Sequence, residues 1–204
     1  MIERACMSVK MHSWGVPVYT EPGCLRRYGV AKEKKLNSMR FLEQHRVEYK
    51  VHYYDEELHS APEVAQALGV EPERVFKTLV VLPLQGKPVL AVIPGNHELD
   101  LKALARAAAE KKLSMASHKE AEQLTGLKVG GISSLALMQK NWRIFLDTSA
   151  RNYEHIFMSA GQRGINLEVP VEGFIEVTGA HENMLIITSR SIQKDAPILL
   201  HQRQ

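Results

Sequence analysis

One eight-residue run, Val75 to Leu82, limits the possible fold more than any other part of the chain. Its β-branched and apolar residues predict a buried β-strand. Because side chains alternate across a strand, Lys77 shares its face of the strand with Leu79 and Val81. An ammonium among apolar neighbours is unfavourable unless it reaches water, finds a partner or has a function. Lys77 is therefore either a strand-entry lysine that reaches solvent or a candidate functional residue.

Further strands and helices alternate along the middle of the chain. Strands are predicted at residues 49–54, 75–82, 89–93, 143–146 and 155–159. Helices are predicted at 39–45, 61–68 after the cap residue Ser60, 101–109 after Asp100, 118–124 after Ser117, and from Pro170 to the stop at Gly179. Strands that meet by tight turns, mixed with helices, predict an α+β fold with a mixed sheet.

The chain divides into three regions by pattern and charge. Residues 1–36 lack periodicity and hold seven Lys/Arg and three Asp/Glu, a net charge of +4, so they are predicted to form an irregular basic leader. Residues 37–181 are predicted to form the domain, and 182–204 a C-terminal tail that is either mobile or a surface strand. Residues 37–182 hold 16 basic and 19 acidic groups, so any contact of the domain with RNA is expected to be local, weak or shared with another protein.

Composition excludes several classes of protein. The 204 residues are 45% apolar and 24% charged, as in ordinary globular proteins. No apolar run approaches the ~18–20 residues of a membrane span, and no secretory signal is evident, so a cytoplasmic protein without membrane contact is expected. Neither the two cysteines, Cys6 and Cys24, nor the nine histidines show metal-ligand spacing, and nucleotide-binding glycine signatures are absent. No metal and no cofactor are expected.

Two further segments accompany Lys77-Thr78. Residues 127–134 have the sequence Leu-Lys-Val-Gly-Gly-Ile-Ser-Ser, and residues 156–165 have Ile-Phe-Met-Ser-Ala-Gly-Gln-Arg-Gly-Ile. Together, in this order, the three segments resemble the YbaK/ProX family of aminoacyl-tRNA deacylases, which is related to the editing insertion of bacterial prolyl-tRNA synthetases. The resemblance extends from about Asn37 to Ala180. It implies a curved, barrel-like mixed β-sheet flanked by helices.

The resemblance also implies a set of site residues. Lys77 corresponds to the catalytic lysine, where positive charge can hold a phosphate or stabilise a developing oxyanion. The residues implied to bind substrate are Tyr54, Thr78, Gly130, Gly131, Ile132, Ser133, Ser159, Gly161, Arg163 and Asn166. Each also has a structural alternative: the glycines can belong to an ordinary turn, Tyr54 can be a half-buried aromatic residue, and Arg163 can be solvated.

The sequence departs from the family pattern at two positions. Ser134 stands where proline is usual, which removes a rigid restraint on φ and puts the shape of the loop in question. Asn166 stands where many relatives have aspartate, so a charged role is lost there.

The activity implied is the trans-acting hydrolysis of mischarged aminoacyl-tRNA, with Cys-tRNA(Pro) as the expected substrate. A synthetase pocket separates ligands that differ by a methylene by only ~1–3 kcal/mol, so a second sieve is needed. In the cysteine-specific relatives the substrate's own thiol attacks the ester, which suits a domain without an evident nucleophile and base. Removal of alanine or another small residue is one alternative, and a non-catalytic adaptor for tRNA or a synthetase is another. The expected partners are the acceptor end of aminoacyl-tRNA and prolyl-tRNA synthetase, and not DNA.

Overall fold

The computed structural model describes residues 10–11, 17–18, 35–58, 60–179 and 190–191, in two compact units, Met1–Lys34 and Lys35–Gln204. In the first unit, β1 (Lys10–Met11) and β2 (Pro17–Val18) pair antiparallel. Residues 1–9, 12–16 and 19–34 of the predicted leader lie outside the described residues, whereas its last two residues, Lys35 and Leu36, belong to the second unit. Most of the predicted tail also lies outside the described residues, and only its β11 (Arg190–Ser191) is described, pairing with β6 (His97–Glu98). The second unit holds the predicted domain.

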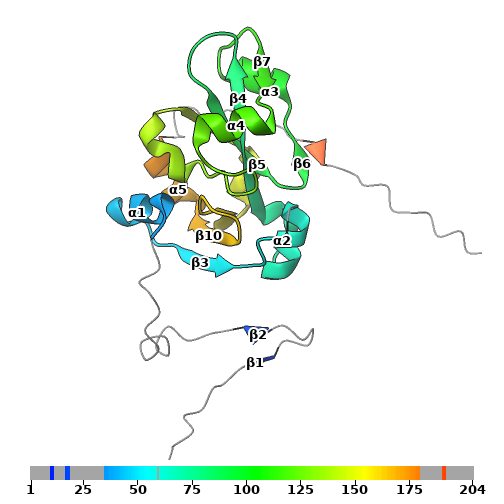
Figure 1. The fold of residues 1–204 in the computed structure, drawn as a ribbon, viewed down its shortest axis with the longest axis vertical. Coiled ribbons are helices and arrows are strands. Elements are labelled where there is room, and N and C mark those ends of the chain that lie inside the picture. The colour runs from blue at the N-terminus through cyan, green and yellow to red at the C-terminus, as the bar shows by residue number, and fades with distance from the viewer. Residues whose placement is uncertain (1–9, 12–16, 19–34, 59, 180–189, 192–204) are drawn as a thin grey trace, which may run out of the picture. The chain divides into compact units, whose positions relative to one another are not determined.

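A seven-stranded mixed sheet forms the centre of the second unit (Figure 1). Its strands lie in the order β3-β10-β9-β4-β5-β8, and β7 pairs with β4. Their bounds are β3 (Lys50–Tyr53), β4 (Val75–Pro83), β5 (Val89–Pro94), β7 (Leu113–Met115), β8 (Arg143–Leu146), β9 (His155–Ser159) and β10 (Ile165–Pro170). The pairs β4/β9 and β5/β8 are parallel and the others are antiparallel, which confirms the predicted α+β class with a mixed sheet. The sheet is curved but not closed, because its end strands β3 and β8 do not pair.

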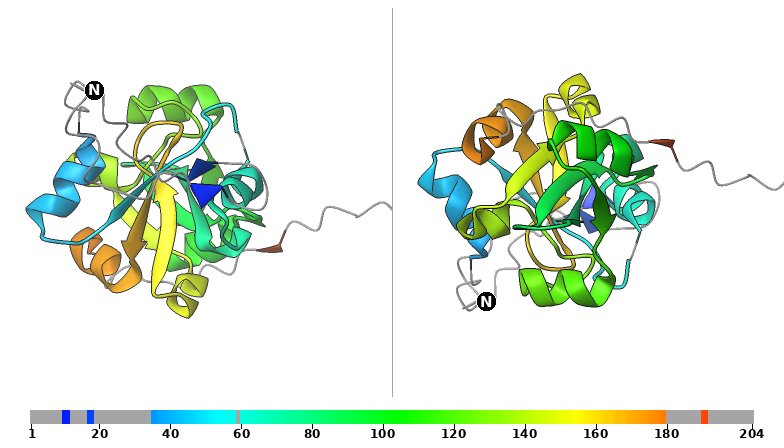
Figure 2. Two further views of the ribbon diagram at one scale, coloured as in Figure 1. Left: turned by 90° about the horizontal axis from the view of Figure 1, so that it is seen from below. Right: turned by 90° about the horizontal axis from the view of Figure 1, so that it is seen from above.

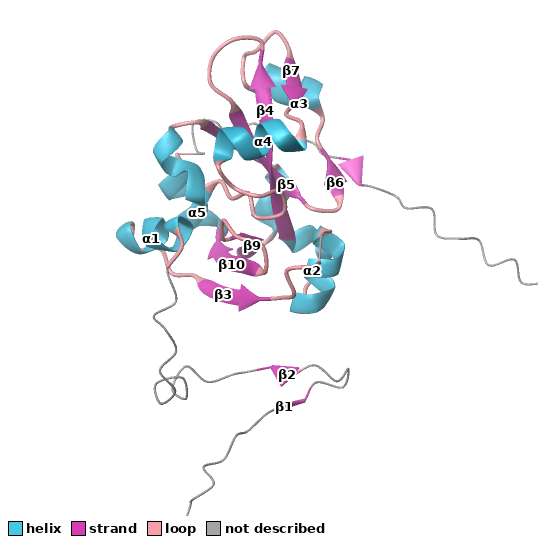
Figure 3. Ribbon diagram, in the orientation of Figure 1, coloured by secondary structure: helices cyan, strands magenta, loops and turns pink. Residues whose placement is uncertain are grey.

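Helices flank this sheet (Figures 2 and 3), and α2, α3 and α4 begin where a capping side chain accepts from their first N–H groups. Ser60 and Ser117 each form a capping box, and Asp100 accepts from two main-chain N–H groups. The helices are α1 (Asn37–Gln44), α2 (Ala61–Leu68), α3 (Leu101–Ala107), α4 (His118–Thr125), α5 (Val171–Thr178) and the 3-10 helices η2 (Pro72–Arg74), η3 (Leu135–Lys140) and η4 (Thr148–Asn152). No helix among the described residues is long and apolar enough to cross a membrane.

The strand β4 is buried on both of its faces. Phe76 and Val80 pack into the largest apolar cluster with β10 and α5, whereas Val81 packs into a second cluster with α3. Val75 joins a third cluster against α2. The alternation therefore separates Lys77 from Thr78: consecutive side chains leave the strand on opposite sides of the sheet.

Two strands of the sheet were not among the sequence predictions. β10 alternates apolar Ile165, Leu167 and Val169 with Asn166 and Glu168, so the apolar side chains share one face of the strand, on which Leu167 and Val169 are fully buried. The alternation of apolar and polar residues is visible in the sequence, but it directly follows the turn residues Gly161 to Gly164, and no strand was predicted there. β7 has only three residues and forms because it pairs with the end of β4, which local sequence does not specify.

Candidate functional site

A cavity of about 890 Å³ runs along the middle of β4. Its walls come from β4, from the ends of β9 and β10, from the start of α2, from the turn after β5, from the segment between β7 and α4, and from the 129–132 loop. These segments are far apart in the sequence, and the sheet order brings them together.

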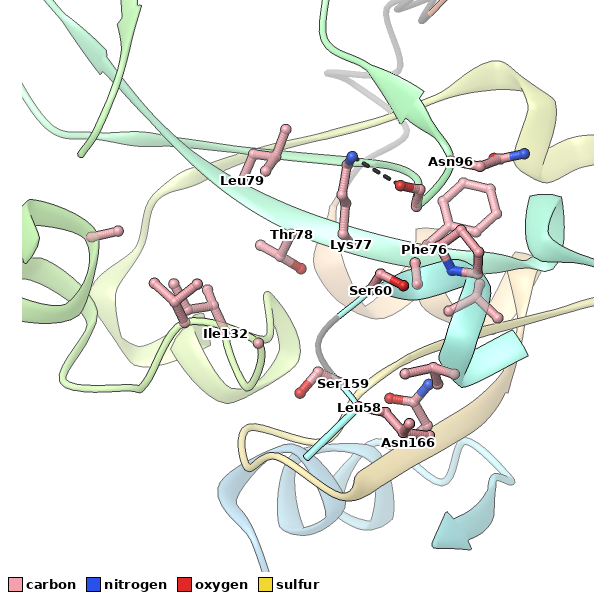
Figure 4. A pocket seen from close by; sticks show the side chains of 18 of the residues that line it. Leu58, Ser60, Phe76, Lys77, Thr78, Leu79, Asn96, Ile132, Ser159 and Asn166 are labelled. Atoms are coloured by element: carbon pink, nitrogen blue, oxygen red, sulfur yellow. Dashed lines mark hydrogen bonds between the residues drawn. The ribbon is translucent and has the colours of Figure 1, made fainter. Parts of the chain in front are cut away.

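The Lys77 side chain points to the turn that follows β5 (Figure 4). Its Nζ donates to the carbonyl oxygens of Gly95 at 3.0 Å and His97 at 2.7 Å. Burial lowers the pKa of Lys77, and the nearby Glu98 carboxylate opposes that shift. An ammonium has three donors, so one N–H of Lys77 remains for a ligand.

Thr78 points from the other face of β4, the side on which Ile132, Ser159 and Asn166 lie in Figure 4. Its Oγ1 accepts a hydrogen bond from the Ser134 main-chain N–H at 3.3 Å. Ser134 has φ −61°, which is the value that proline would impose, so the loop keeps this backbone conformation without the ring. The serine adds an N–H that proline lacks, and that N–H binds Thr78.

Ser159 and Asn166 lie directly opposite each other on β9 and β10. Asn166 is only 3% exposed, and its side chain forms no hydrogen bond with another residue that the structure describes. Ser159 Oγ accepts from the Gly161 N–H at 3.3 Å, which leaves its hydroxyl proton available. The pair therefore presents neutral donors and an acceptor to the cavity.

The glycine loop packs against the turn between β9 and β10. Arg163 Nε donates to the Val129 carbonyl oxygen at 2.7 Å and lies over Gly130, which has φ +88°. A Cβ on Gly131 would lie 3.0 Å from the Arg163 main-chain nitrogen, and the Gly131 N–H is held by the Lys128 carbonyl oxygen at 2.8 Å. Close packing of two loops thus explains both glycines.

The residues predicted from the sequence divide into two groups. Seven line the cavity: Tyr54, Lys77, Thr78, Gly130, Ile132, Ser159 and Asn166. Four are not among the residues that line it: Gly131, Ser133, Gly161 and Arg163. Ser133 is fully buried and its hydroxyl has no partner among the described residues. Burial raises the pKa of Tyr54, which keeps its phenol neutral.

Three polar residues of the cavity were not predicted as site residues. Ser60 is the cap of α2, His118 begins α4, and Asn96 lies in the turn that Lys77 holds. The Asn96 Nδ2 donates to Glu73 Oε1 at 2.7 Å, which fixes its orientation. In the sequence, the role of Ser60 as the cap of α2 is enough to explain a serine at this position. Its place in the cavity wall is seen only in the tertiary structure.

The chemistry of the lining is unusual for a hydrolase. Among the described residues, those that line the cavity include no carboxylate and no thiol, and Lys77 is the only lysine or arginine among them. The described part of the chain also holds no group of three or more potential metal ligands. The site therefore offers hydrogen-bond donors, one ammonium and the imidazole of His118, but no carboxylate or thiol among its described lining residues.

Comparison with known proteins gives consistent results. The aminoacyl-tRNA editing domain family matches residues 55–177. A protein of Enterococcus faecalis named Cys-tRNA(Pro)/Cys-tRNA(Cys) deacylase EbsC is 43% identical over 148 residues, which cover 72% of this chain and 90% of that protein. A proline–tRNA ligase of Maridesulfovibrio salexigens is 35% identical over 89 residues, but these cover only 15% of the ligase.

A solved structure shares the fold. A crystal structure described as a trans-editing enzyme for prolyl tRNA synthetase superimposes with a TM-score of 0.60 at 22% identity, covering 76% of this chain and 97% of that one. At this level of identity the likeness shows the arrangement of the sheet and helices alone.

Proposed function

Because the chain belongs to the aminoacyl-tRNA editing domain family, we propose that it hydrolyses the ester bond of mischarged aminoacyl-tRNA in trans, with Cys-tRNA(Pro) as its principal substrate. The observation that carries this assignment is the 43% identity to a named deacylase across 90% of that protein. The family match over residues 55–177 includes the strand, the glycine loop and the β9–β10 segment that together build the cavity. The domain acts on a tRNA charged elsewhere.

The cavity suits a reaction in which the enzyme positions the substrate and stabilises charge. We infer that the substrate thiol attacks its own ester carbonyl carbon, so that a sulfur–carbon bond forms, the carbon–oxygen bond to the ribose breaks, and the thiol proton passes to the ribose oxygen. Water then opens the resulting cyclic thioester and gives free cysteine. Such a step needs no nucleophile from the protein, in agreement with the lining. The third N–H of Lys77 is free to stabilise negative charge on the ester or to hold the terminal phosphate.

Two finer parts of the proposal concern partners and location. The similarity to short stretches of prolyl-tRNA ligases supports association with prolyl-tRNA synthetase, which would supply tRNA selectivity through avidity. Action beside a synthetase implies the cytoplasm.

A deacylation panel tests the function. tRNA bearing the proline anticodon is charged separately with cysteine, alanine, serine and proline, and loss of each ester is followed with and without the full chain. We expect rapid loss of cysteine and retention of proline. Faster removal of alanine than of cysteine would reassign the substrate, and no enzyme-dependent loss of any of them would contradict deacylase activity.

A further inference from the structure

The strand β4 has an unpaired stretch on one edge. Along one edge it pairs with β5 continuously from Phe76 to Val81. Along the other edge it has two partners: β9 lies opposite Val75 and Phe76, and β7 lies opposite residues 81–83. No described strand lies beside residues 77–80 on that edge. The sheet therefore has a gap there, between the end of β9 and the end of β7.

The hydrogen bonds identify which main-chain groups face this gap. The N–H and C=O of one residue point to the same side of a strand, and the side alternates from residue to residue. The Val75 carbonyl oxygen accepts from Gly95 N–H, on the β5 side, at 2.7 Å. The Val80 carbonyl oxygen accepts from Ala116 N–H, on the β7 side, at 3.1 Å. Even-numbered residues therefore point to the gap.

Three groups are left there without a partner. The Thr78 N–H, the Thr78 C=O and the Val80 N–H form no hydrogen bond with any residue that the structure describes. Unpaired main-chain groups on a strand edge are a template for a further extended segment. Here they lie in a recess rather than on an outer edge of the sheet.

The gap coincides with the cavity. Ser159 at the end of β9 lines the cavity on one side, and Met115 and Ala116 at the end of β7 line it on the other. Thr78 and Val80 line it between them. A ligand in this cavity thus occupies the place of the missing strand.

We propose that the aminoacyl group binds as a one-residue strand on this open edge. The α-amine donates to the Thr78 carbonyl oxygen. The ester carbonyl oxygen accepts from the N–H of Thr78 or from the N–H of Val80, which lie on either side of the Thr78 carbonyl along β4. One amino-acid unit carries a donor and an acceptor in the arrangement that a strand edge pairs with. The idea rests on the deacylase function proposed above and assigns the atoms that hold its substrate.

Two features of the cavity agree with this mode of binding. Its described lining contains no carboxylate, so the Thr78 carbonyl oxygen is an acceptor through which the amine can be held. A main-chain N–H on the ester carbonyl oxygen stabilises the negative charge that develops there. Because the edge contacts only main-chain atoms of the ligand, selection among amino acids falls to the surrounding walls.

Amide hydrogen exchange tests the proposal on the full-length protein. The probe is a non-hydrolysable amide of cysteine with 3′-amino-3′-deoxyadenosine, and exchange at single residues is followed by NMR. At saturation we expect exchange of the Thr78 or Val80 N–H to slow at least about tenfold, the equivalent of one hydrogen bond. Leu79 is the internal control, because its position opposite Ala91 turns its N–H toward β5 in both states. A second probe lacks the α-amine and should bind about tenfold more weakly.

The outcomes separate this proposal from the assigned function. Deacylation of Cys-tRNA(Pro) with unchanged exchange at both Thr78 and Val80 would overturn the strand-edge binding and leave the function in place. Equal affinity for the probe without an amine would also overturn it. Absence of both deacylation and probe binding would overturn the function and, with it, the edge binding.

Discussion

The side chains of Lys77 and Thr78 leave β4 on opposite faces, although the two residues are adjacent in the chain. The ammonium holds the turn at Gly95 and His97, while the Thr78 hydroxyl leaves the other face of β4 and binds the Ser134 N–H. Lys77 therefore has a structural role in shaping one wall as well as the proposed role toward substrate. A variant at this position has to be interpreted with both roles in view.

Replacement of Lys77 by alanine is expected to lower the deacylation rate by about 10²–10³, because a charged contact with the transition state is lost. Two carbonyl oxygens also lose a donor, so a fall in stability of ~1–3 kcal/mol is expected. Single-turnover rates and thermal melting measure the two effects. Lys87→Ala, an exposed lysine in the β4–β5 turn, is the matched control. A folded Lys77→Ala protein with normal turnover would remove Lys77 from the mechanism.

At the scale of elements, two loops determine the shape of the cavity. The 129–132 loop and the β9–β10 turn approach so closely that Gly131 has no room for a side chain. The same turn follows Ser159 and precedes Asn166, so its position sets where both polar side chains lie.

Gly131→Ala should destabilise the protein by ~1–3 kcal/mol, because the added Cβ must displace the main chain at Gln162 and Arg163. Gly126→Ala is the comparison: its Cβ would meet nothing, and only its positive φ is strained. Denaturant unfolding should show both losses. The substrate KM should rise only for Gly131→Ala, and equal KM values would show that the loop contact does not shape the site.

A second prediction at this scale concerns the ion pairs of Glu168 between β3 and β10. Burial raises the pKa of Glu168, but the His52 hydrogen bond at 2.9 Å and the charges of Lys50, His52 and His155 outweigh it and lower the pKa below its usual 4.5. The stabilisation is complete above about pH 4.5 and is lost as the pH falls through the lower folded value.

Glu168→Gln should therefore cost ~1 kcal/mol at neutral pH, and the difference from the original protein should shrink on acidification. Unfolding at a series of pH values from 7 to 3 measures it. Glu176→Gln, an exposed carboxylate on α5, is the control and should show no such convergence. If the difference in unfolding free energy between Glu168→Gln and the original protein were the same at all pH values, the stabilisation by Glu168 would not be ionic.

At the scale of the whole molecule, the start of the folded unit can be tested. Ser38 is fully buried and its Oγ donates to the Ala160 carbonyl oxygen, and Leu36 packs against the main apolar cluster. A chain beginning at Lys35 should melt as the full chain does. A chain beginning at Met39 leaves the buried Ala160 carbonyl unpaired and should lose ~1–3 kcal/mol. Equal melting of the two truncated chains would show that the first turn of α1 contributes nothing.

The basic leader is expected to contribute to tRNA binding but not to chemistry. Residues 1–36 have a net charge of +4 against −3 for residues 37–182. Each lost phosphate contact should flatten the plot of log affinity against log salt concentration by about 0.7–0.9. Titration of tRNA at several salt concentrations, with the full chain and with the chain beginning at Lys35, which lacks six Lys/Arg and three Asp/Glu, measures this slope. Identical affinities and slopes would assign RNA binding to the domain surface.

The sequence by itself determined the local features of this protein. Caps and glycines predicted the positions of α2, α4 and α5, and apolar runs predicted β4 and β5. The Lys77-Thr78 strand, together with the segments 127–134 and 156–165, predicted the family. These features depend on neighbouring residues only, so propensity and spacing are sufficient to predict them.

Only the tertiary structure decided which strands meet. β9 joins β4 across about 80 residues of chain, and the three-residue β7 covers the far end of the same edge. The gap between them, with the free main-chain groups of Thr78 and Val80, follows from that pairing. Strand pairing depends on which faces the whole chain can bury and is not fixed by local propensity, so the open edge could not be predicted from the residues that form it.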